Sequence, residues 1–242
     1  MASRSPQDTA KHAVAEKAAA MVEDKMVLGL GSGSTMRLTL LSIGRRIQAE
    51  GLSLKGVPTS EATAVLAREQ GIELVELDAR PELDLAFDGA DEVVPGSFAL
   101  TKGLGGALLR EKLVAIAASW LVILVDDGKL VDQLGSRSPI PVEVVPFAHK
   151  TTARRLAKLG GEPVLRLASD GTPFRSDGGN LIYDLKMPPI GAPEGLAAAI
   201  KGITGVVEHG IFLGMAKDVI VGNADGTTRR LPAVLSRVDN GT

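Results

Sequence analysis

The sequence predicts an α/β protein built from a doubly wound, mostly parallel (Rossmann-like) sheet and a second, smaller α+β unit of the ferredoxin-like type. Short apolar runs alternate with helical patterns over the first half of the chain, which indicates β-α-β units and a parallel sheet. Hydrophobic residues make up 45% of the 242 residues and aromatic residues only 3%, so aliphatic side chains must form the core. This composition suits helices packed on a parallel sheet, whose strands are apolar on both faces.

The first part is expected to begin with an Ala-rich helix over residues 8–23, followed by a short strand at 27–30. Leu83, Leu85 and Phe87 alternate with Asp84, Ala86 and Asp88, which is the periodicity of a strand. The other elements expected in this part are a helix at 36–50, a strand at 54–57, a helix capped by Thr59 or Ser60 and ended by Gly71, a strand at 72–77, a helix at 107–119 and a strand at 121–125.

Near Gly135 the order of elements changes to β-α-β-β-α-β, which is typical of a split βαβ (ferredoxin-like) unit. The expected elements are strands at 142–145, 163–167, 180–185 and 206–209, with helices at 151–159 and 194–201. The chain is then expected to return to the first sheet through residues 218–221. We therefore predict a catalytic domain over residues 1–134 plus 211–242 and a small domain over residues 135–210.

Composition excludes several classes of function. The 27 basic and 29 acidic residues leave a net charge of −2, which argues against a nucleic-acid partner. The absence of cysteine excludes disulfides, thiolate metal sites and a cysteine nucleophile, and the three histidines are too far apart for clustered metal-ligand spacing. The longest apolar run, 117–125, is too short to span a bilayer, and the N-terminus lacks the apolar stretch of a secretory signal. We expect a soluble, cytoplasmic protein without membrane contact.

The segment Gly29–Thr35 (GLGSGST) lies where a predicted strand meets a predicted helix. Small residues at this junction let backbone N–H groups and hydroxyls approach an anion at a helix N-terminus. No Lys precedes the Ser/Thr as in a Walker loop, and Met36 stands where GxGxxG requires its last Gly, so a monophosphate fits better than a dinucleotide. A tight turn that binds no ligand is the alternative.

The segment Asp88–Glu92 (DGADE) follows the carboxyl end of a strand, which is the edge where open α/β sheets bind ligands. Asp88 and Asp91 are three residues apart around a Gly-Ala turn, so both carboxylates can face one pocket and hold hydroxyls or pass protons. Turn formation alone also explains Asp at a strand end. Metal binding by the acidic cluster is a further alternative, weakened by the absence of a nearby His.

A second Gly-rich loop, Lys102–Gly106 (KGLGG), opens the helix that carries Glu111. The amine of Lys102 could polarise a carbonyl or stabilise an enediolate. Periodicity assigns the core face of this helix to other positions, so Glu111 alone would be interpreted as solvated. The core-face residues are Leu109, Leu113, Ile116 and Trp120.

Two further lysines are candidates for substrate binding. Lys129 follows the next strand in the turn Asp126–Lys129, and Lys11 precedes an Ala-rich stretch near the N-terminus. Each alone is better explained as a surface residue. The joint layout is more informative, because two Gly-rich loops, a double-Asp turn and a Lys turn all follow strands of one sheet. Proton transfer on a small phosphorylated sugar fits these groups.

The sequence closely resembles the ribose-5-phosphate isomerase A family, and the order and spacing of the matching motifs agree over nearly the whole chain. The matching segments are GLGSGST (29–35), FDGADE (87–92), TKGLGGALLREK (101–112), DDGKLV (126–131), PIPVEVVPFA (139–148), GGNLIYD (178–184) and ITGVVEHGIF (203–212). The resemblance implies interconversion of ribose 5-phosphate and ribulose 5-phosphate without a metal or an organic cofactor. It also implies a homodimer or homotetramer, with contacts through the small domain.

Carried over residue by residue, the resemblance makes Glu111 the base that moves a proton between C1 and C2, so the outward face of its helix would line the cleft. Asp88, Asp91 and Lys102 would bind sugar oxygens, assist ring opening and stabilise a cis-enediolate. The family commonly has Gly where Leu104 stands and often Thr at Ser32, and the change to Leu104 narrows the backbone freedom of its loop. The remaining implied substrate contacts are Lys11, Ser32, Gly33, Ser34, Thr35, Gly89, Ala90, Gly103, Leu104, Gly105 and Lys129.

Two other functions are compatible with these residues. The first is a related sugar-phosphate enzyme, such as an amino-sugar-phosphate deaminase or a phosphosugar lactonase. The second is a non-catalytic sugar-phosphate sensor that controls transcription, although the short N-terminal segment offers no room for a DNA-binding helix-turn-helix.

Overall fold

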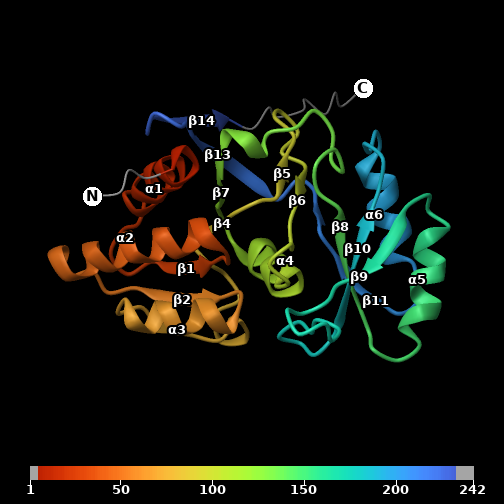
Figure 1. The fold of residues 1–242 in the computed structure, drawn as a ribbon. Coiled ribbons are helices and arrows are strands. Elements are labelled where there is room, and N and C mark those ends of the chain that lie inside the picture. Colours follow the sequence, from red (N-terminus) through yellow and green to blue (C-terminus); the bar gives the residue numbers. More distant parts are fainter. Residues whose placement is uncertain (1–4, 233–242) are drawn as a thin grey trace, which may run out of the picture.

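The structure is a computed structural model that describes residues 5–232, and its largest element is a seven-stranded sheet (Figure 1). The strand order is β14-β13-β7-β4-β1-β2-β3, and all neighbours are parallel except β13 and β14. The bounds are β1 Val27–Leu30, β2 Lys55–Pro58, β3 Glu73–Leu74, β4 Leu85–Asp88, β7 Leu121–Asp126, β13 Ala216–Gly222 and β14 Thr228–Pro232. The predicted α/β, mostly parallel fold class is confirmed.

Helices cover both faces of this sheet, as a doubly wound fold requires. Aliphatic side chains of α1 (Pro6–Ala19) and α2 (Ser34–Glu50) share one core with β1, β4 and β7, and Ala67 of α3 (Glu61–Glu69) joins it. On the opposite face, α4 (Leu108–Ala117) contributes Val114 and Ala115 to a second core. The predicted cap of α3 is Ser60, whose hydroxyl accepts a hydrogen bond from the Thr63 amide.

A four-stranded antiparallel sheet forms the smaller unit, in the order β11-β8-β10-β9. Its elements follow the predicted β-α-β-β-α-β order of a ferredoxin-like unit: β8 Ile140–Val144, α5 His149–Ala157, β9 Glu162–Leu165, β10 Leu181–Lys186, α6 Pro193–Lys201 and β11 Val206–His209. Leu156 of α5 and Ile200 of α6 pack on one face of this sheet. The domain boundaries remain a prediction, and their ends at residues 1–4 and 233–242 lie outside the described residues.

Three very short strands connect the two units, and the sequence pattern did not indicate them. β5 (Glu92–Val93), β6 (Leu100–Thr101) and β12 (Ile211–Phe212) form an antiparallel sheet in the order β12-β6-β5. A two-residue strand is too short to show periodicity. This sheet matters for the site because β6 ends immediately before Lys102.

One strand is shorter than the sequence predicts. Instead of a strand over 72–77, only Glu73–Leu74 pairs with β2, and a 3₁₀ turn at Leu77–Ala79 follows. β3 lies at the edge of the sheet, so it has one neighbouring strand only, and the turn ends the pairing. Within residues 5–232, no helix has the length and apolar character needed to cross a bilayer.

Candidate active site

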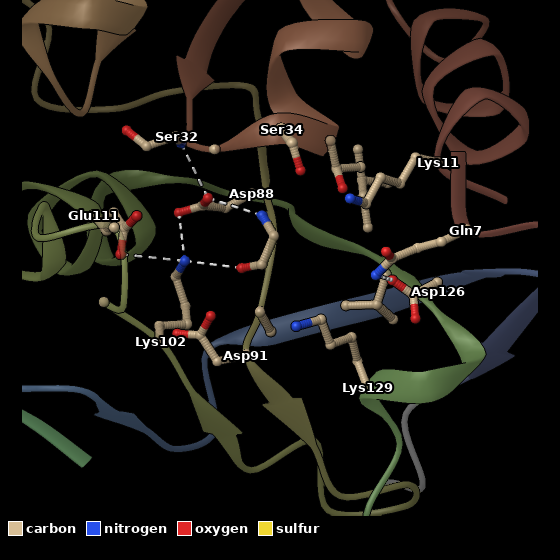
Figure 2. Close-up of a pocket in the computed structure, with 18 residues that line it drawn as sticks. Gln7, Lys11, Ser32, Ser34, Asp88, Asp91, Lys102, Glu111, Asp126 and Lys129 are labelled. Atoms are coloured by element: carbon tan, nitrogen blue, oxygen red, sulfur yellow. Dashed lines mark hydrogen bonds and ion pairs between the residues drawn. The ribbon is translucent and has the colours of Figure 1, made fainter. Parts of the chain in front are cut away.

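The candidate site lies at the carboxyl ends of β1 and β4, two adjacent parallel strands from which the chain proceeds in opposite directions across the sheet. Such a switch point leaves a crevice where ligands of open α/β sheets bind. A cavity of about 160 Å³ opens there (Figure 2). The predicted site residues that line it are Lys11, Ser32, Gly33, Ser34, Thr35, Asp88, Gly89, Ala90, Asp91, Lys102, Gly103, Gly105, Glu111 and Lys129.

The first Gly-rich loop touches the Asp88 carboxylate closely. A Cβ atom on Gly31 would lie 2.3 Å from Asp88 Oδ1, so only glycine permits this approach. The Ser32 amide donates to Asp88 Oδ1 at 3.2 Å, whereas the Ser32 hydroxyl turns away from the cavity toward Thr59 and Ser60. In this structure, the loop therefore presents Ser32 to the site through its backbone.

One end of the cavity is suited to an anion. Gly33 precedes α2 with a φ of +97°, and no side chain caps the helix, so the first amides of its 17 residues are free to bind a ligand. Ser34 lies at this helix start and the Lys11 ammonium extends toward it, while Lys129 reaches into the cavity from the facing wall (Figure 2). Free helix amides and two ammonium groups together favour a phosphate here.

Lys102 is the centre of the opposite end. Its Nζ lies 2.8 Å from Asp88 Oδ2 and 3.3 Å from Glu111 Oε2, and it donates to the Gly89 carbonyl oxygen at 2.8 Å. Burial alone would lower the pKa of the Lys102 ammonium, but the carboxylates of Asp88 and Glu111 outweigh burial and raise this pKa above its ordinary value. Lys102 is therefore a fixed cation at neutral pH.

Glu111 is buried, with 5% of its surface exposed, and it borders the cavity. Among the described residues, its Oε2 is the one buried side-chain oxygen or nitrogen atom that lacks a hydrogen-bond partner. Burial raises the pKa of Glu111 to about 7, and the attraction of Lys102 only partly offsets this effect. A buried carboxylate that is half ionised near neutral pH and has a free lone pair is suited to general-base catalysis.

The periodicity of α4 gave the wrong face. Leu113, Ile116 and Trp120, the predicted core face, are 49%, 65% and 44% exposed, whereas Glu111 is buried. The reason is that α4 lies between the seven-stranded sheet and the smaller unit, so its polar residues face the buried site. The structure agrees here with the family resemblance and not with the helical pattern.

Asp91 joins the site through the second Gly-rich loop. Its Oδ2 accepts a hydrogen bond from the Leu104 amide at 3.0 Å, and burial raises its pKa. Leu104 does not line the cavity, and its carbonyl oxygen accepts from Arg166 at 2.9 Å. A direct contact between Leu104 and substrate therefore stays a prediction.

Four lining residues were not among the predicted site residues: Gln7, Leu124, Val125 and Asp126. Gln7 Nε2 donates to Asp126 Oδ2 at 3.3 Å, beside Lys11 and Lys129 (Figure 2). Gln7 and Lys11 are four residues apart and so share a helix face, which is the signal that could have identified Gln7. Leu124 and Val125 carry no polar group that would have distinguished them.

Among the described residues, no three His, Asp or Glu side chains are arranged to hold a metal ion. The cavity instead combines an anion end with a buried carboxylate and ammonium pair, at the ligand edge of an open α/β sheet. These features define an enzyme that moves protons on a small anionic substrate.

Comparison with known proteins identifies the family. The family model for ribose 5-phosphate isomerase A (phosphoriboisomerase A) matches residues 55–226. A ribose-5-phosphate isomerase A from Thermomicrobium roseum is 53% identical over 219 residues, which cover 90% of this chain and 92% of the relative. The chain belongs to the ribose 5-phosphate isomerase A family.

Solved structures agree with this assignment. Ribose 5-phosphate isomerase A from Methanocaldococcus jannaschii superposes with a TM-score of 0.89 at 43% identity, covering 93% of this chain and 99% of that one. A D-ribose-5-phosphate isomerase in complex with phospho-erythronic acid gives the same TM-score at 38% identity, with 93% and 99% coverage.

Proposed function

We propose that this protein is an aldose–ketose isomerase that interconverts D-ribose 5-phosphate and D-ribulose 5-phosphate, with Glu111 as the base. The observation that carries the proposal is the Glu111 carboxylate: it borders the cavity, has one oxygen without a hydrogen-bond donor, and lies 3.3 Å from a lysine ammonium. This pairing is what removal of a proton next to a carbonyl group requires, because the base needs a free lone pair and the oxyanion needs a nearby cation.

Substrate binding is proposed to begin at the anion end. The phosphate would be held by the first amides of α2, with Ser34 and Thr35, and by the ammonium groups of Lys11 and Lys129. Fixing the phosphate there directs the carbon chain toward Lys102 and Glu111, at the opposite end of the cavity. One related isomerase was solved in complex with phospho-erythronic acid. Like ribose 5-phosphate, this ligand joins a phosphate group to a short hydroxylated carbon chain.

The proton balance of the reaction assigns the remaining roles. The Glu111 carboxylate takes the proton from C2 of the open-chain aldose, and the electron pair moves through C1 to the carbonyl oxygen. Lys102 stabilises the resulting cis-enediolate, while Asp88 and Asp91 bind the sugar oxygens and assist ring opening. Glu111 then returns the proton to C1, the O2 proton moves to O1, and the ketose results. No net proton is gained or lost.

The direct test is conversion of ribose 5-phosphate by the purified protein in the presence of EDTA. We expect the parent chain to form ribulose 5-phosphate rapidly. In Glu111→Gln we expect turnover to fall by a factor of about 10³ or more, because the variant lacks its catalytic base. Glu61→Gln changes an exposed carboxylate on α3 and is the matched control. Loss of activity in EDTA that a divalent ion restores would contradict the metal-free mechanism.

Two other results would overturn the proposal. Binding of ribose 5-phosphate without any turnover would favour a sensor. Turnover of an amino-sugar phosphate or a phosphosugar lactone in a substrate panel, with none of ribose 5-phosphate, would favour the related enzymes instead.

A cytoplasmic location and a homodimer or homotetramer belong to the same proposal. The supporting observation for self-association is Phe147 in the small unit, whose surface is 88% exposed. Aromatic side chains are enriched at protein–protein interfaces. Light scattering on Phe147→Ser, compared with the parent chain, tests the assembly, and an unchanged mass would remove Phe147 from the interface.

A further inference from the structure

Lys112 is a buried cation that the proposed mechanism does not use. It follows Glu111 in the sequence, is only 7% exposed, and does not line the cavity. We infer that Lys112 is a positioning residue: it fixes the backbone strip 209–211 and thereby sets the separation of Lys102 from Glu111. This inference rests on the proposed function, because it concerns the same base and cation.

The Lys112 ammonium has three protons and three close oxygen acceptors. Its Nζ lies 2.8 Å from Glu208 Oε1, 2.7 Å from the His209 carbonyl oxygen and 3.0 Å from the Ile211 carbonyl oxygen. The Phe212 ring centroid lies 4.7 Å from the same nitrogen, which adds a cation–π contact. An apolar side chain could fill this space, but it could not hold two backbone carbonyls at once.

The strip held by Lys112 is the one that supports Lys102. Gly210, between the two carbonyl groups, accepts the Lys102 backbone N–H at 2.8 Å. A Cβ atom on Gly210 would lie 2.1 Å from the Lys102 carbonyl oxygen, so strip and loop are in direct contact. The Lys102 ammonium also lies 5.5 Å from the centroid of the Phe212 ring, the ring that Lys112 contacts.

Two neighbouring residues of α4 therefore fix Lys102 in different ways. Glu111 contacts its ammonium group at 3.3 Å, and Lys112 holds the strip to which its backbone is hydrogen-bonded. A shift of the strip would move Lys102 relative to Glu111 even if the helix stayed in place. Because a displacement of 1 Å in a catalytic pair can cost about 100-fold in rate, this support matters for turnover.

The charges around Lys112 preserve its position at neutral pH. Burial lowers the pKa of Lys112, while the Glu208 carboxylate opposes this effect. Glu208 also pairs with Lys201 at 2.8 Å. Burial works to raise the pKa of Glu208, but hydrogen bonds from Lys112 and Lys201 outweigh it and lower this pKa to about 2, so Glu208 is ionised. Burial lowers the pKa of His209 to about 4, so this ring is neutral and does not repel the ammonium.

The charged groups that face Glu111 itself are Lys102, Asp88 and Asp91.

The test compares Lys112→Met, which keeps the length but loses the three hydrogen bonds, with Lys201→Met. Lys201 is the other cation on Glu208, but it is half exposed and makes no contact with the strip carbonyls of His209 or Ile211. For Lys112→Met we expect kcat/KM for ribose 5-phosphate to fall by a factor of about 10 to 100. For Lys201→Met we expect parental kinetics.

The decisive readout is the acid midpoint of the kcat–pH profile. Lys102 holds the pKa of Glu111 down, so a Lys102 that has moved away lets this midpoint rise. If Lys112 had a purely structural role, its replacement would reduce the amount of active enzyme and leave the midpoint unchanged. An unchanged midpoint would therefore overturn the inference. Gly210→Ala, which pushes the same strip off Lys102, is expected to raise the midpoint as well.

Two further arms keep the result interpretable. Lys112→Arg retains the cation but not the lysine geometry, so a raised midpoint in this variant separates the effect of position from that of charge. It also replaces Lys112→Met if that variant does not fold, and an unchanged midpoint in Lys112→Arg would contradict the inference. Failure of the parent chain to turn over ribose 5-phosphate would instead refute the proposed function.

Discussion

Glu111 Oε2 lies 3.3 Å from Lys102 Nζ, but it accepts no hydrogen bond from that ammonium group. The ammonium donates instead to the Gly89 carbonyl oxygen and lies 2.8 Å from Asp88 Oδ2. Lys102 thus attracts the Glu111 carboxylate without occupying its lone pair. A base that is charged and still unbonded can accept a proton from carbon, which a fully hydrogen-bonded carboxylate cannot do without first losing a partner.

The first prediction concerns the pH dependence of kcat. Burial raises the pKa of Glu111 to about 7, and only the ionised form can act as a base, so kcat should rise with pH through about 7 and fall about tenfold per pH unit well below it. Saturating ribose 5-phosphate between pH 5.5 and 9 gives this profile. The measurement uses kcat because the free substrate phosphate titrates near pH 6, which affects kcat/KM. An unchanged kcat down to pH 5.5 would exclude Glu111 as the base.

The second prediction is that Glu111→Gln is more stable than the parent chain at pH 8. The pKa of Glu111 is raised on folding, so between about pH 4.5 and 7 the folded state binds more protons than the unfolded state, and stability falls as pH rises. Gln carries no such penalty. We expect a gain of about 1–3 kcal/mol at pH 8 that shrinks toward pH 5, measured by urea unfolding. A destabilised Glu111→Gln at pH 8 would contradict the prediction.

The positions of the loops were predictable from the sequence, because strand ends of a parallel sheet meet at one edge. Asp88 ends β4, and Gly31 follows β1, so adjacency of these two strands brings the first loop against the Asp88 carboxylate. Local pattern and chain order are enough to place both loops at one edge of the sheet, whereas the pairing of β1 with β4 is known from the structure. The family resemblance added the roles of the residues.

The orientation of Glu111 could not be obtained from periodicity. A helical pattern assumes one apolar face and one wet face, whereas α4 is enclosed on two sides and exposes Leu113 and Ile116. Gln7 was missed for a different reason, because its contact with Asp126 joins residues 119 positions apart in the sequence. Such contacts depend on how α1 packs on β7, which no local pattern encodes.

The third prediction separates binding of the phosphate from chemistry. Lys11→Met and Lys129→Met each remove an ammonium group from the anion end of the cavity, far from the Glu111 carboxylate. We expect KM for ribose 5-phosphate to rise about 5- to 50-fold with a smaller change in kcat, because phosphate contacts bind substrate and transition state similarly. Lys17→Met is the control, since Lys17 is an exposed residue of the same helix as Lys11. An unchanged KM in both variants would place the phosphate elsewhere.

The fourth prediction concerns how the first Gly-rich loop is held. The Ser32 hydroxyl lies 2.7 Å from Thr59 Oγ1, and the Thr63 hydroxyl donates to the Gly31 carbonyl oxygen at 3.0 Å, behind the loop. Ser32→Ala keeps the amide that donates to Asp88, so its KM should change by less than about threefold. Thr63→Val removes the donor to Gly31, and because loop and Asp88 are in contact, it should lower kcat/KM by about tenfold.

Thr152→Val is the matched control for Thr63→Val, because Thr152 is also a buried threonine but lies on α5 of the smaller unit. Each substitution replaces a hydroxyl by a methyl group, so any general cost of removing a buried hydroxyl is shared. Steady-state kinetics on the three variants and thermal unfolding of each distinguish loop positioning from lost stability. A large rise in KM for Ser32→Ala, with Thr63→Val unaffected, would mean that the Ser32 hydroxyl turns into the cavity and binds substrate directly.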